Sequence, residues 1–363
     1  MNQPAQTVRV ELAERSYDIA IDSGNLPSAG EFLAQRGTIS HVVVITDQNV
    51  EKPHAMQVAE SLGGKPWKVD VIVIEAGESS KSLESASALW QGLLQLGADR
   101  KTVLVAVGGG VIGDLAGFVA ATYARGIRFV QVPTSLLAQV DSSVGGKVGI
   151  NLPQAKNMVG AFLQPLGVLI DTATLDTLPE REYRSGLGEV VKYGVILDAP
   201  FFEMLASSGA AIDARDHQVL AEVVARCCRL KADVVRQDER EETGLRAVLN
   251  YGHTFAHAFE TLTGYGTLLH GEAVAIGMEC AARLAQRLGR VDAGFTARQH
   301  ELLVALGLPV EVPKLDHEKI LSTMLLDKKT EHGRLRLVLP TRMGHVELVD
   351  GVDANAIRAA LRG

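Results

Sequence analysis

The chain has 363 residues, a formal net charge of −7 at pH 7 and only three cysteines. This length allows two domains, because single hydrophobic cores stop growing at roughly 250 to 300 residues, and the negative charge argues against a general nucleic-acid binder. No apolar run approaches the roughly 20 residues of a membrane span, and the first ten residues lack a secretory pattern, so we expect a protein of the reducing cytoplasm.

Short apolar runs separated by helix-length stretches fill the first half of the chain. Residues 8–12 and 17–21 are predicted to pair as a hairpin. Further strands are predicted at 41–46, 69–74, 102–107, 129–132 and 168–170. Such runs are typical of parallel strands buried on both faces. We therefore expect a Rossmann-like α/β domain with a mostly parallel sheet over residues 1–178.

Beyond residue 178 the hydrophobic period becomes helical. Amphipathic stretches are found at 181–206, 217–239, 246–262 and 271–288. A small hairpin, 335–339 with 345–349, and a helix over 354–361 are predicted to close the chain. We expect a mainly α-helical second domain over residues 179–363, with an active site in the cleft between the two domains.

A glycine-rich turn follows the predicted strand 102–107. The run Gly108-Gly109-Gly110-Val111-Ile112-Gly113-Asp114 satisfies G-x-G-x-x-G between a strand and a helix, which is typical of a dinucleotide site. Gly109 and Gly110 are expected to lie closest to the pyrophosphate. The acid that usually holds the ribose roughly 20 residues later is missing. Asp47 and Glu78, which follow other strands, are possible substitutes, and an acid there favours NAD over NADP.

Histidines and acids with metal-ligand chemistry gather in the second half. His253 and His257 lie at i and i+4 on one helix face, His270 opens the next helix, and Glu189 lies in GLGEVVK. Nitrogen and oxygen ligands that leave a position open favour a catalytic site over a structural zinc site. The spacing leaves open whether both His253 and His257 bind metal or one carries protons. Two more acids stay formal ligand candidates, Glu260 and Glu272.

Cationic side chains predict a pocket for an anionic substrate. A polar, glycine-rich passage runs from Asp141 to Lys147 and is followed by Lys156-Asn157, which we interpret as binding surface. Lys192 lies three residues after Glu189, so one helix face directs a cation and a metal ligand at the same space.

Six motifs in order, GGGVIGD, VPTSLLAQVDSSVGGK, KNMVGAF, GLGEVVKYG, LNYGHTFAHAFE and LHGEAVAIGM, resemble those of the 3-dehydroquinate synthases in the sugar phosphate cyclase family. The resemblance spans TDQNV to DKK. It implies a zinc or cobalt ion held by Glu189, His253 and His270. It implies substrate contacts by Lys147, Lys156, Asn157, Lys192, Lys231, Arg246, His257 and Lys328, and a homodimer in which Arg125 is lent across the interface.

The resemblance also implies NAD and its contacts. The positions that match are Asp47, Asn49, Gly77, Glu78, Lys81, Gly109, Gly110, Val111, Ile112, Gly113, Asp114, Thr134, Ser135, Asp141, Lys147, Lys156, Thr174, Leu175, Asp176, Thr177 and Leu178.

The implied activity is conversion of 3-deoxy-D-arabino-heptulosonate 7-phosphate to 3-dehydroquinate and phosphate, a step of the shikimate pathway. The proton carrier stays open among His257, Asp141 and the substrate phosphate. Two alternatives share the fold, namely another sugar phosphate cyclase and an NAD- and metal-dependent polyol dehydrogenase. A non-catalytic NAD sensor would need a closed structural metal site, for which no suitable cysteine is present.

Overall fold

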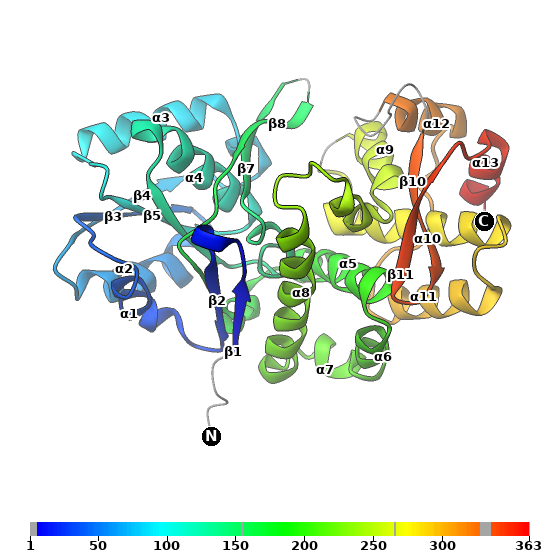
Figure 1. The fold of residues 1–363 in the computed structure, drawn as a ribbon, viewed down its shortest axis with the longest axis horizontal. Helices are drawn as coiled ribbons and strands as arrows, with labels where there is room; N and C mark the ends of the chain where they lie inside the picture. Colours follow the sequence, from blue (N-terminus) through cyan, green and yellow to red (C-terminus); the bar gives the residue numbers. More distant parts are fainter. Residues whose placement is uncertain (1–5, 154, 265, 327–334, 363) are drawn as a thin grey trace. The chain divides into compact units, whose positions relative to one another are not determined.

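The computed structural model describes residues 6–153, 155–264, 266–326 and 335–362. The chain forms two compact units (Figure 1). Unit 1 comprises Met1–Leu178 and His217–Arg240, and unit 2 comprises Pro179–Asp216 and Glu241–Gly363. The stretch 217–239, expected in the second domain, thus belongs to unit 1. The helix of this stretch packs on the hairpin of β1 (Gln6–Val10) and β2 (Tyr17–Asp22) and on the segment 138–142, which cover its apolar face.

A seven-stranded sheet forms the centre of unit 1, in the order β1-β2-β9-β6-β5-β3-β4. The strands are β1 (Gln6–Val10), β2 (Tyr17–Asp22), β3 (His41–Asp47), β4 (Lys68–Ile74), β5 (Val103–Gly108), β6 (Arg128–Pro133) and β9 (Val168–Asp171). Strands β1 and β2 pair antiparallel, and the other neighbours pair in parallel. The predicted hairpin and parallel strands are confirmed.

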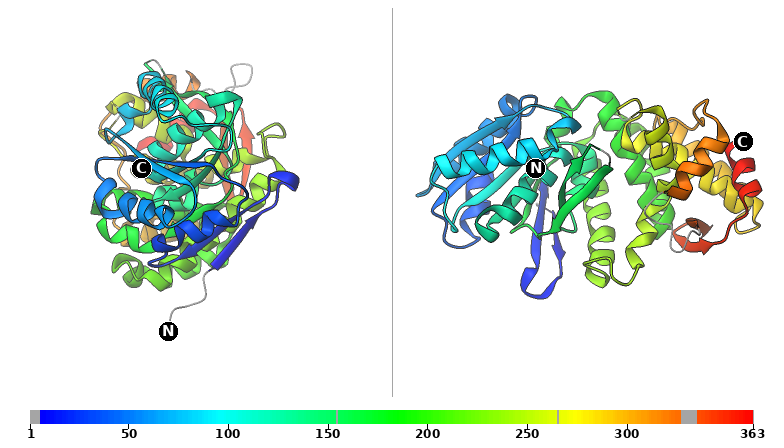
Figure 2. Two further views of the ribbon diagram at one scale, coloured as in Figure 1. Left: turned by 90° about the vertical axis from the view of Figure 1, so that its left-hand side faces the viewer. Right: turned by 90° about the horizontal axis from the view of Figure 1, so that it is seen from above.

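Helices cover both faces of this sheet (Figures 1 and 2). They are α1 (Ala29–Ala34), α2 (Met56–Gly63), α3 (Leu83–Gln95), α4 (Gly110–Thr122) and α8 (His217–Gln237). Short helical segments are η1 (Ala13–Arg15), η2 (Leu26–Ser28), η3 (Glu51–Ala55), η4 (Glu78–Ser80), η5 (Tyr123–Arg125), η6 (Ala138–Ser142) and η7 (Thr172–Thr177). Helices α1 and α2 pack on one face, and α3 and α4 on the other.

The strand order reverses direction between β3 and β5. From β3 the chain moves outward to β4, then crosses back over the opposite face to β5 and continues to β6. Open α/β sheets bind ligands at the carboxyl ends of the strands on either side of such a switch point. The ends of β3 and β5 are therefore the expected ligand position in unit 1.

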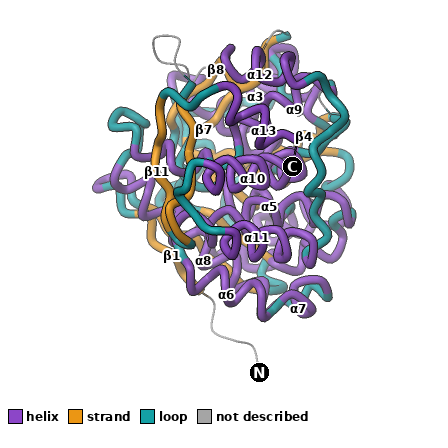
Figure 3. The backbone as a smooth tube through the Cα atoms, turned by 90° about the vertical axis from the view of Figure 1, so that its right-hand side faces the viewer, coloured by secondary structure: helices purple, strands orange, loops and turns teal. Residues whose placement is uncertain are grey.

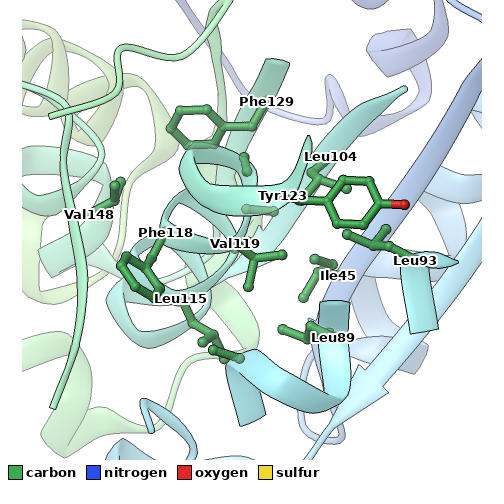
Figure 4. Packing of buried hydrophobic residues seen from close by; sticks show 14 of the residues in the cluster. Ile45, Leu89, Leu93, Leu104, Leu115, Phe118, Val119, Tyr123, Phe129 and Val148 are labelled. Carbon is green, nitrogen blue, oxygen red and sulfur yellow. The ribbon is translucent and has the colours of Figure 1, made fainter. Parts of the chain in front are cut away.

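Helix α4 is apolar on nearly all sides, as expected for a helix covered all round. Figure 4 shows Leu115, Phe118 and Val119 of this helix within the apolar cluster that also contains Ile45 and Leu104 of the sheet. A separate hairpin, β7 (Lys147–Leu152) and β8 (Ala155–Phe162), packs against the same helix. The polar and glycine-rich composition of this stretch hides the strand pattern, so the sequence predicted only a binding surface here and not the hairpin.

Unit 2 is mainly helical, as predicted. Its helices are α5 (Glu180–Leu197), α6 (Ala199–Ser207), α7 (Gly209–Asp213), η8 (Leu245–Asn250), α9 (His253–Thr263), α10 (His270–Arg287), α11 (Ala293–Ala305), α12 (His317–Leu326) and α13 (Ala354–Arg362). The predicted hairpin is present as β10 (Arg336–Arg342) and β11 (His345–Asp350). Helix α10 lies centrally and contacts α5, α9, α11 and α13 (Figure 3).

Two predicted helices of unit 2 are interrupted. The stretch 181–206 is two helices, because Asp198 ends α5 and its carboxylate accepts the Phe201 N–H at 3.1 Å, capping α6. The stretch 246–262 begins as the 3-10 segment η8 and breaks at Gly252, which has φ +78°. Within the described ranges, none of the helices has both the length and the hydropathy needed to cross a bilayer.

Candidate functional site

Three side chains with metal-ligand chemistry converge in unit 2. Glu189 comes from α5, and His253 and His270 are the first residues of α9 and α10. The Nε2 atoms of His253 and His270 lie 3.5 and 3.6 Å from Oε1 of Glu189. One ligand atom from each residue lies within 4.8 Å of the other two. One divalent ion with nitrogen and oxygen ligands at about 2.0 to 2.2 Å fits this spacing.

Glycines adjacent to these residues let the three helices approach each other. A Cβ on Gly271 would collide with the backbone oxygen of Ser185, and one on Gly188 would collide with Gly271. Gly252 has φ +78°, and a Cβ there would lie 2.9 Å from the backbone nitrogen of Met278. Each predicted ligand therefore follows or precedes a glycine at a close helix contact, which places the three side chains together.

Hydrogen bonds orient both imidazoles for metal binding. His253 Nδ1 lies 3.1 Å from the Tyr251 carbonyl oxygen, which can only accept, so Nδ1 carries the proton. His270 Nδ1 lies 3.4 Å from Glu260 Oε2. Both arrangements turn Nε2 toward Glu189 as the ligand nitrogen, the usual arrangement of metal-bound histidines.

The environment of the Glu189 carboxylate indicates whether Glu189, His253 and His270 together fit a cation. Its side chain is 1% exposed, and no group among the described residues donates a hydrogen bond to Oε1. A buried carboxylate oxygen without a donor is costly. A divalent ion bound by Oε1 and the two Nε2 atoms would remove that cost, so the donor set fits the implied metal.

Charged groups surround the three ligands. The ammonium of Lys192, 2% exposed, contacts the Glu189 carboxylate, so the predicted pairing of these residues is confirmed. Burial lowers the pKa of His270, but hydrogen bonding to Glu260 and the charges of Glu260 and Glu189 outweigh it and raise this pKa above its ordinary value. The His257 ring centroid lies 5.7 Å from that of His253, which keeps its substrate-side role open.

Glu272, the other acid that stayed a formal ligand candidate, lies at the start of α10 and is bonded to protein groups there. Its Oε2 accepts the Leu269 N–H at 2.8 Å at the start of α10, and its Oε1 accepts from Arg181 Nε at 2.7 Å. It therefore caps the helix that carries His270. Arg246, another predicted substrate residue of unit 2, is 3% exposed, and its Nε lies 3.7 Å from Oε1 of Glu241. Lys328 falls outside the described residues.

In unit 1 the glycine-rich turn lies at the switch point. Gly108 ends β5 and Gly110 begins α4. A Cβ on Gly110 would lie 3.1 Å from Ser142 Oγ, and one on Gly109 would lie 3.4 Å from Ser135 Oγ. The bare backbone therefore leaves open the space above the helix N-terminus, where a pyrophosphate is bound in such folds.

Both acids proposed as ribose partners follow strands of this sheet. Asp47 ends β3, beside β5, and its Oδ1 accepts the N–H groups of Asn49 and Val50 at 2.8 and 3.2 Å. Glu78 follows β4, after Gly77 with φ +110°. Both candidates for the missing acid thus lie at the carboxyl edge, and Asp47 lies at the switch point itself.

Lys81 connects the loop after β4 to the β7–β8 hairpin. Its buried ammonium contacts the carboxylate of Asp114 and Oδ1 of Asn157, both predicted site residues. Asn151, which the sequence analysis missed, donates its backbone N–H to the Lys81 carbonyl and its side-chain amide to Glu78, both at 2.8 Å. No motif marks Asn151, because its role depends on the hairpin pairing.

The remaining predicted residues of unit 1 lie on separate elements. Lys231 of α8 donates to the Asp141 carbonyl at 2.6 Å and lies 2.9 Å from its Oδ1. Lys147 pairs with Phe162 at one end of the β7–β8 hairpin, whereas Lys156 lies beside its turn. The structure therefore joins Lys231 to Asp141 but separates the two hairpin lysines along the strands.

Comparison with known proteins gives the family. Residues 71–185 match the model of the 3-dehydroquinate synthase N-terminal domain, and residues 186–330 match that of the C-terminal domain. The chain is 51% identical to the 3-dehydroquinate synthase of Desulforamulus reducens over 98% of this chain and 99% of the relative. The chain belongs to the 3-dehydroquinate synthase family.

Solved structures place this family member among the sugar phosphate cyclases in fold. A 2-deoxy-scyllo-inosose synthase complexed with carbaglucose-6-phosphate, NAD⁺ and Co²⁺ has a TM-score of 0.89 at 29% identity, covering 98% of this chain and 99% of that one. The 2-epi-5-epi-valiolone synthase of Streptomyces hygroscopicus, with NAD⁺ and Zn²⁺ bound, has a TM-score of 0.88 at 29% identity, covering 97% of both chains. The expected fold class and family are confirmed.

Proposed function

We propose that this chain is a 3-dehydroquinate synthase that depends on NAD and on one divalent metal ion. It would convert 3-deoxy-D-arabino-heptulosonate 7-phosphate to 3-dehydroquinate and phosphate. The supporting observation is the cluster of Glu189, His253 and His270 with the Lys192 ammonium beside it, in a chain about half identical to curated members over nearly its whole length.

The residues present can hold both cofactors. Glu189, His253 and His270 would bind zinc or cobalt, and the turn at Gly109 and Gly110 would hold NAD. When bound, NAD accepts a hydride and later returns it, while the divalent ion polarises a carbonyl oxygen as a Lewis acid.

The chain's own residues provide positions and charges for the sequence of steps. The substrate's C5 hydroxyl is oxidised, which acidifies the proton at C6 and allows phosphate to leave by β-elimination. The C5 ketone is then reduced again, the ring opens, and an intramolecular aldol reaction closes the carbocycle. Cations offset the charge that develops as phosphate leaves, and we assign this role to Lys147, Lys156 and Lys192.

Ring closure requires one conformer of the open intermediate. We propose that Asn157, Lys231, Arg246 and His257 hold it, since each offers a donor for a hydroxyl or a carboxylate. Asn157 has φ +55°, a conformation uncommon for residues other than glycine, and Lys81 fixes its amide oxygen. Such strained residues concentrate at ligand sites, which supports its assignment.

The decisive assay combines three readouts. The protein is supplied with the heptulosonate phosphate, NAD in excess over that substrate and zinc, and phosphate, NADH and carbocycle are followed together. We expect stoichiometric phosphate and a phosphate-free carbocycle with no net NADH. NADH accumulating in step with product would instead indicate a polyol dehydrogenase, and a carbocycle other than 3-dehydroquinate would indicate a sibling cyclase. A chelator should stop phosphate release, and zinc should restore it.

We further propose a homodimer in which Arg125 of one copy serves the site of the other. Arg125 is exposed and has φ +65°, between Ala124 at +50° and Gly126 at +113°. This strained turn would hold the guanidinium outward. The three cysteines are buried and form no disulfide with one another, which supports the reducing cytoplasm as the location of the protein.

Mixing two inactive variants tests the shared site. In a dimer of Arg125→Ala with Lys192→Met, one site has its own Lys192 and the other copy's Arg125. Statistical mixing should therefore restore about a quarter of the wild-type activity. Arg125 acting within its own chain would leave the mixture inactive.

A further inference from the structure

The hydrogen-bonded register of β6 and β9 stops before their carboxyl ends, although the two strands stay side by side. Their register pairs Gln131 with Val168, and among the described residues no later pair follows. Pro133 ends β6 and has no N–H to donate to a neighbouring strand. The loops that leave these two ends contain predicted NAD residues, namely Thr134 and Ser135 after β6, and Thr174 to Leu178 after β9.

The side chain of Gln139 fills the position where the ladder stops. It is 0% exposed, and its Nε2 donates to the Pro133 carbonyl at 3.3 Å, the Asp171 carbonyl at 3.1 Å and Thr174 Oγ1 at 3.1 Å. Thr174 Oγ1 itself donates to the Asp171 carbonyl, so it must accept from Gln139. All three partners are acceptors, which fixes the orientation of the amide.

The backbone of Gln139 is held as firmly as its side chain. Its N–H donates to the Ser135 carbonyl at 2.9 Å, and its carbonyl accepts from Cys228 Sγ at 3.3 Å. Thr134 in turn donates its N–H to the Gly108 carbonyl at 3.0 Å. One buried residue therefore connects the ends of β6 and β9, and the β6 end is bonded to the glycine-rich turn of β5.

We propose that Gln139 is a positioning residue of the dinucleotide site. Its amide replaces the missing ladder between the carboxyl ends of β6 and β9 and sets the spacing of the loops at 134–135 and 172–178. This inference rests on the proposed function, because it takes those loops as the NAD site. Without the amide, the buried carbonyls of Pro133 and Asp171 both lose the Gln139 donor, while Asp171 keeps that of the Thr174 hydroxyl. The loop after β6 must then move so that the Pro133 carbonyl reaches water or another donor.

The test compares two matched substitutions of buried glutamines. Gln139→Met keeps the side-chain length and removes the donor. Gln299→Met is the control, because Gln299 is also 0% exposed and donates to a backbone carbonyl, that of Met278 at 3.0 Å, but in unit 2. Affinity for NAD is measured by calorimetry, affinity for zinc by chelator competition, and folding by circular dichroism.

We expect Gln139→Met to weaken NAD binding by about tenfold or more and to raise the KM for NAD more than it lowers kcat. Zinc affinity should stay within about twofold of wild type, since the zinc ligands lie in unit 2. Gln299→Met should leave NAD affinity unchanged. A folded Gln139→Met protein with wild-type NAD affinity overturns the proposal, as does equal weakening of NAD binding by both variants.

Gln139→Glu provides an independent test if the methionine variant does not fold. The new carboxyl would face the same three acceptors, namely the carbonyls of Pro133 and Asp171 and Thr174 Oγ1. Burial favours its protonated form, which can donate one hydrogen bond, whereas the ionised form repels the carbonyls. NAD affinity relative to wild type should therefore rise as the pH falls from 8 to 6, and a ratio independent of pH contradicts the proposal. Absence of NAD binding by the wild-type protein would refute the proposed function instead.

Discussion

Glu260 lies behind His270, with its Oε2 3.4 Å from the imidazole Nδ1, so that Nε2 faces Glu189. Carboxylates in this position orient metal-binding histidines, and their loss typically costs about 10- to 100-fold in metal affinity. We therefore expect Glu260→Leu to weaken zinc binding by about that factor. Glu260→Gln keeps an acceptor for Nδ1–H and should weaken binding much less. Competition with a chromophoric chelator measures both, and equal effects of the two substitutions would contradict an orienting role.

On acidification, the loss of zinc affinity should begin at a higher pH than is usual for a histidine ligand. Only the neutral imidazole binds metal, so zinc affinity is complete above the pKa of His270 and is lost as the pH falls through it. Since Glu260 and Glu189 raise this pKa against the effect of burial, the loss should begin above the ordinary value of about 6.5. Glu260→Gln removes one of these charges and should move the decline to lower pH. An unchanged profile in that variant would show that Glu260 does not set the pKa.

The Lys192 ammonium and a bound cation both neutralise Glu189. Removing the lysine should therefore strengthen zinc binding, by about tenfold, while destabilising the metal-free protein, whose buried carboxylate loses its partner. Turnover should nevertheless fall, because the same ammonium is assigned to the leaving phosphate.

Thermal unfolding of Lys192→Met with and without zinc tests both the stronger zinc binding and the lower stability of the metal-free protein. The gain in Tm on adding zinc should exceed that of the wild-type protein. Weaker zinc binding in this variant would mean that the lysine orients Glu189 and does not compete with the metal.

Gly110 is predicted to matter for ligand approach. A Cβ there would lie 3.1 Å from Ser142 Oγ, a tight contact for the protein, and would stand at the start of α4, where we propose that the pyrophosphate binds. Gly110→Ala should weaken NAD binding by about tenfold. Adding Ser142→Gly relieves the contact within the protein but leaves the methyl group over the ligand space. If NAD affinity returns fully in the double variant, the glycine serves packing alone.

Much of the site could be predicted because the informative residues are local in sequence. The turn Gly108–Gly113 directly follows a strand, and Glu189 and Lys192 share one helix face by spacing alone. The convergence of Glu189 with His253 and His270 came from the resemblance, since nothing in the spacing shows that α5, α9 and α10 meet.

What the sequence could not predict depends on contacts between distant segments. Asn151 and Gln139 carry no motif, and their importance appears only once the β7–β8 hairpin forms and the register of β6 with β9 stops at Gln131. The placement of α8 in unit 1 was not predicted for the same reason, because an amphipathic pattern does not tell which surface covers the apolar face of the helix. Chain order suggested a second-domain helix, whereas packing on β1, β2 and η6 decided otherwise.

His54 links stability to pH through a predicted NAD residue. Its Nε2 lies 2.7 Å from Thr177 Oγ1, which donates to the Thr174 carbonyl, so the imidazole Nε2 is the donor and the ring can stay neutral. Burial lowers the pKa of His54, which therefore binds a proton more readily in the unfolded chain. Its contribution to stability is complete above the unfolded pKa of about 6.5 and is lost progressively as the pH falls from there to the lower pKa of the folded protein.

His54→Gln keeps a donor toward Thr177 and removes the titration. Between pH 8 and 5 the wild-type protein should lose more unfolding free energy than the variant, with an excess slope of at most about 1.4 kcal/mol per pH unit for one proton. Urea unfolding at several pH values measures the difference and cancels the titrations common to both proteins. Parallel profiles would show that His54 is already protonated in the folded protein or accessible to water, and that burial does not control its charge.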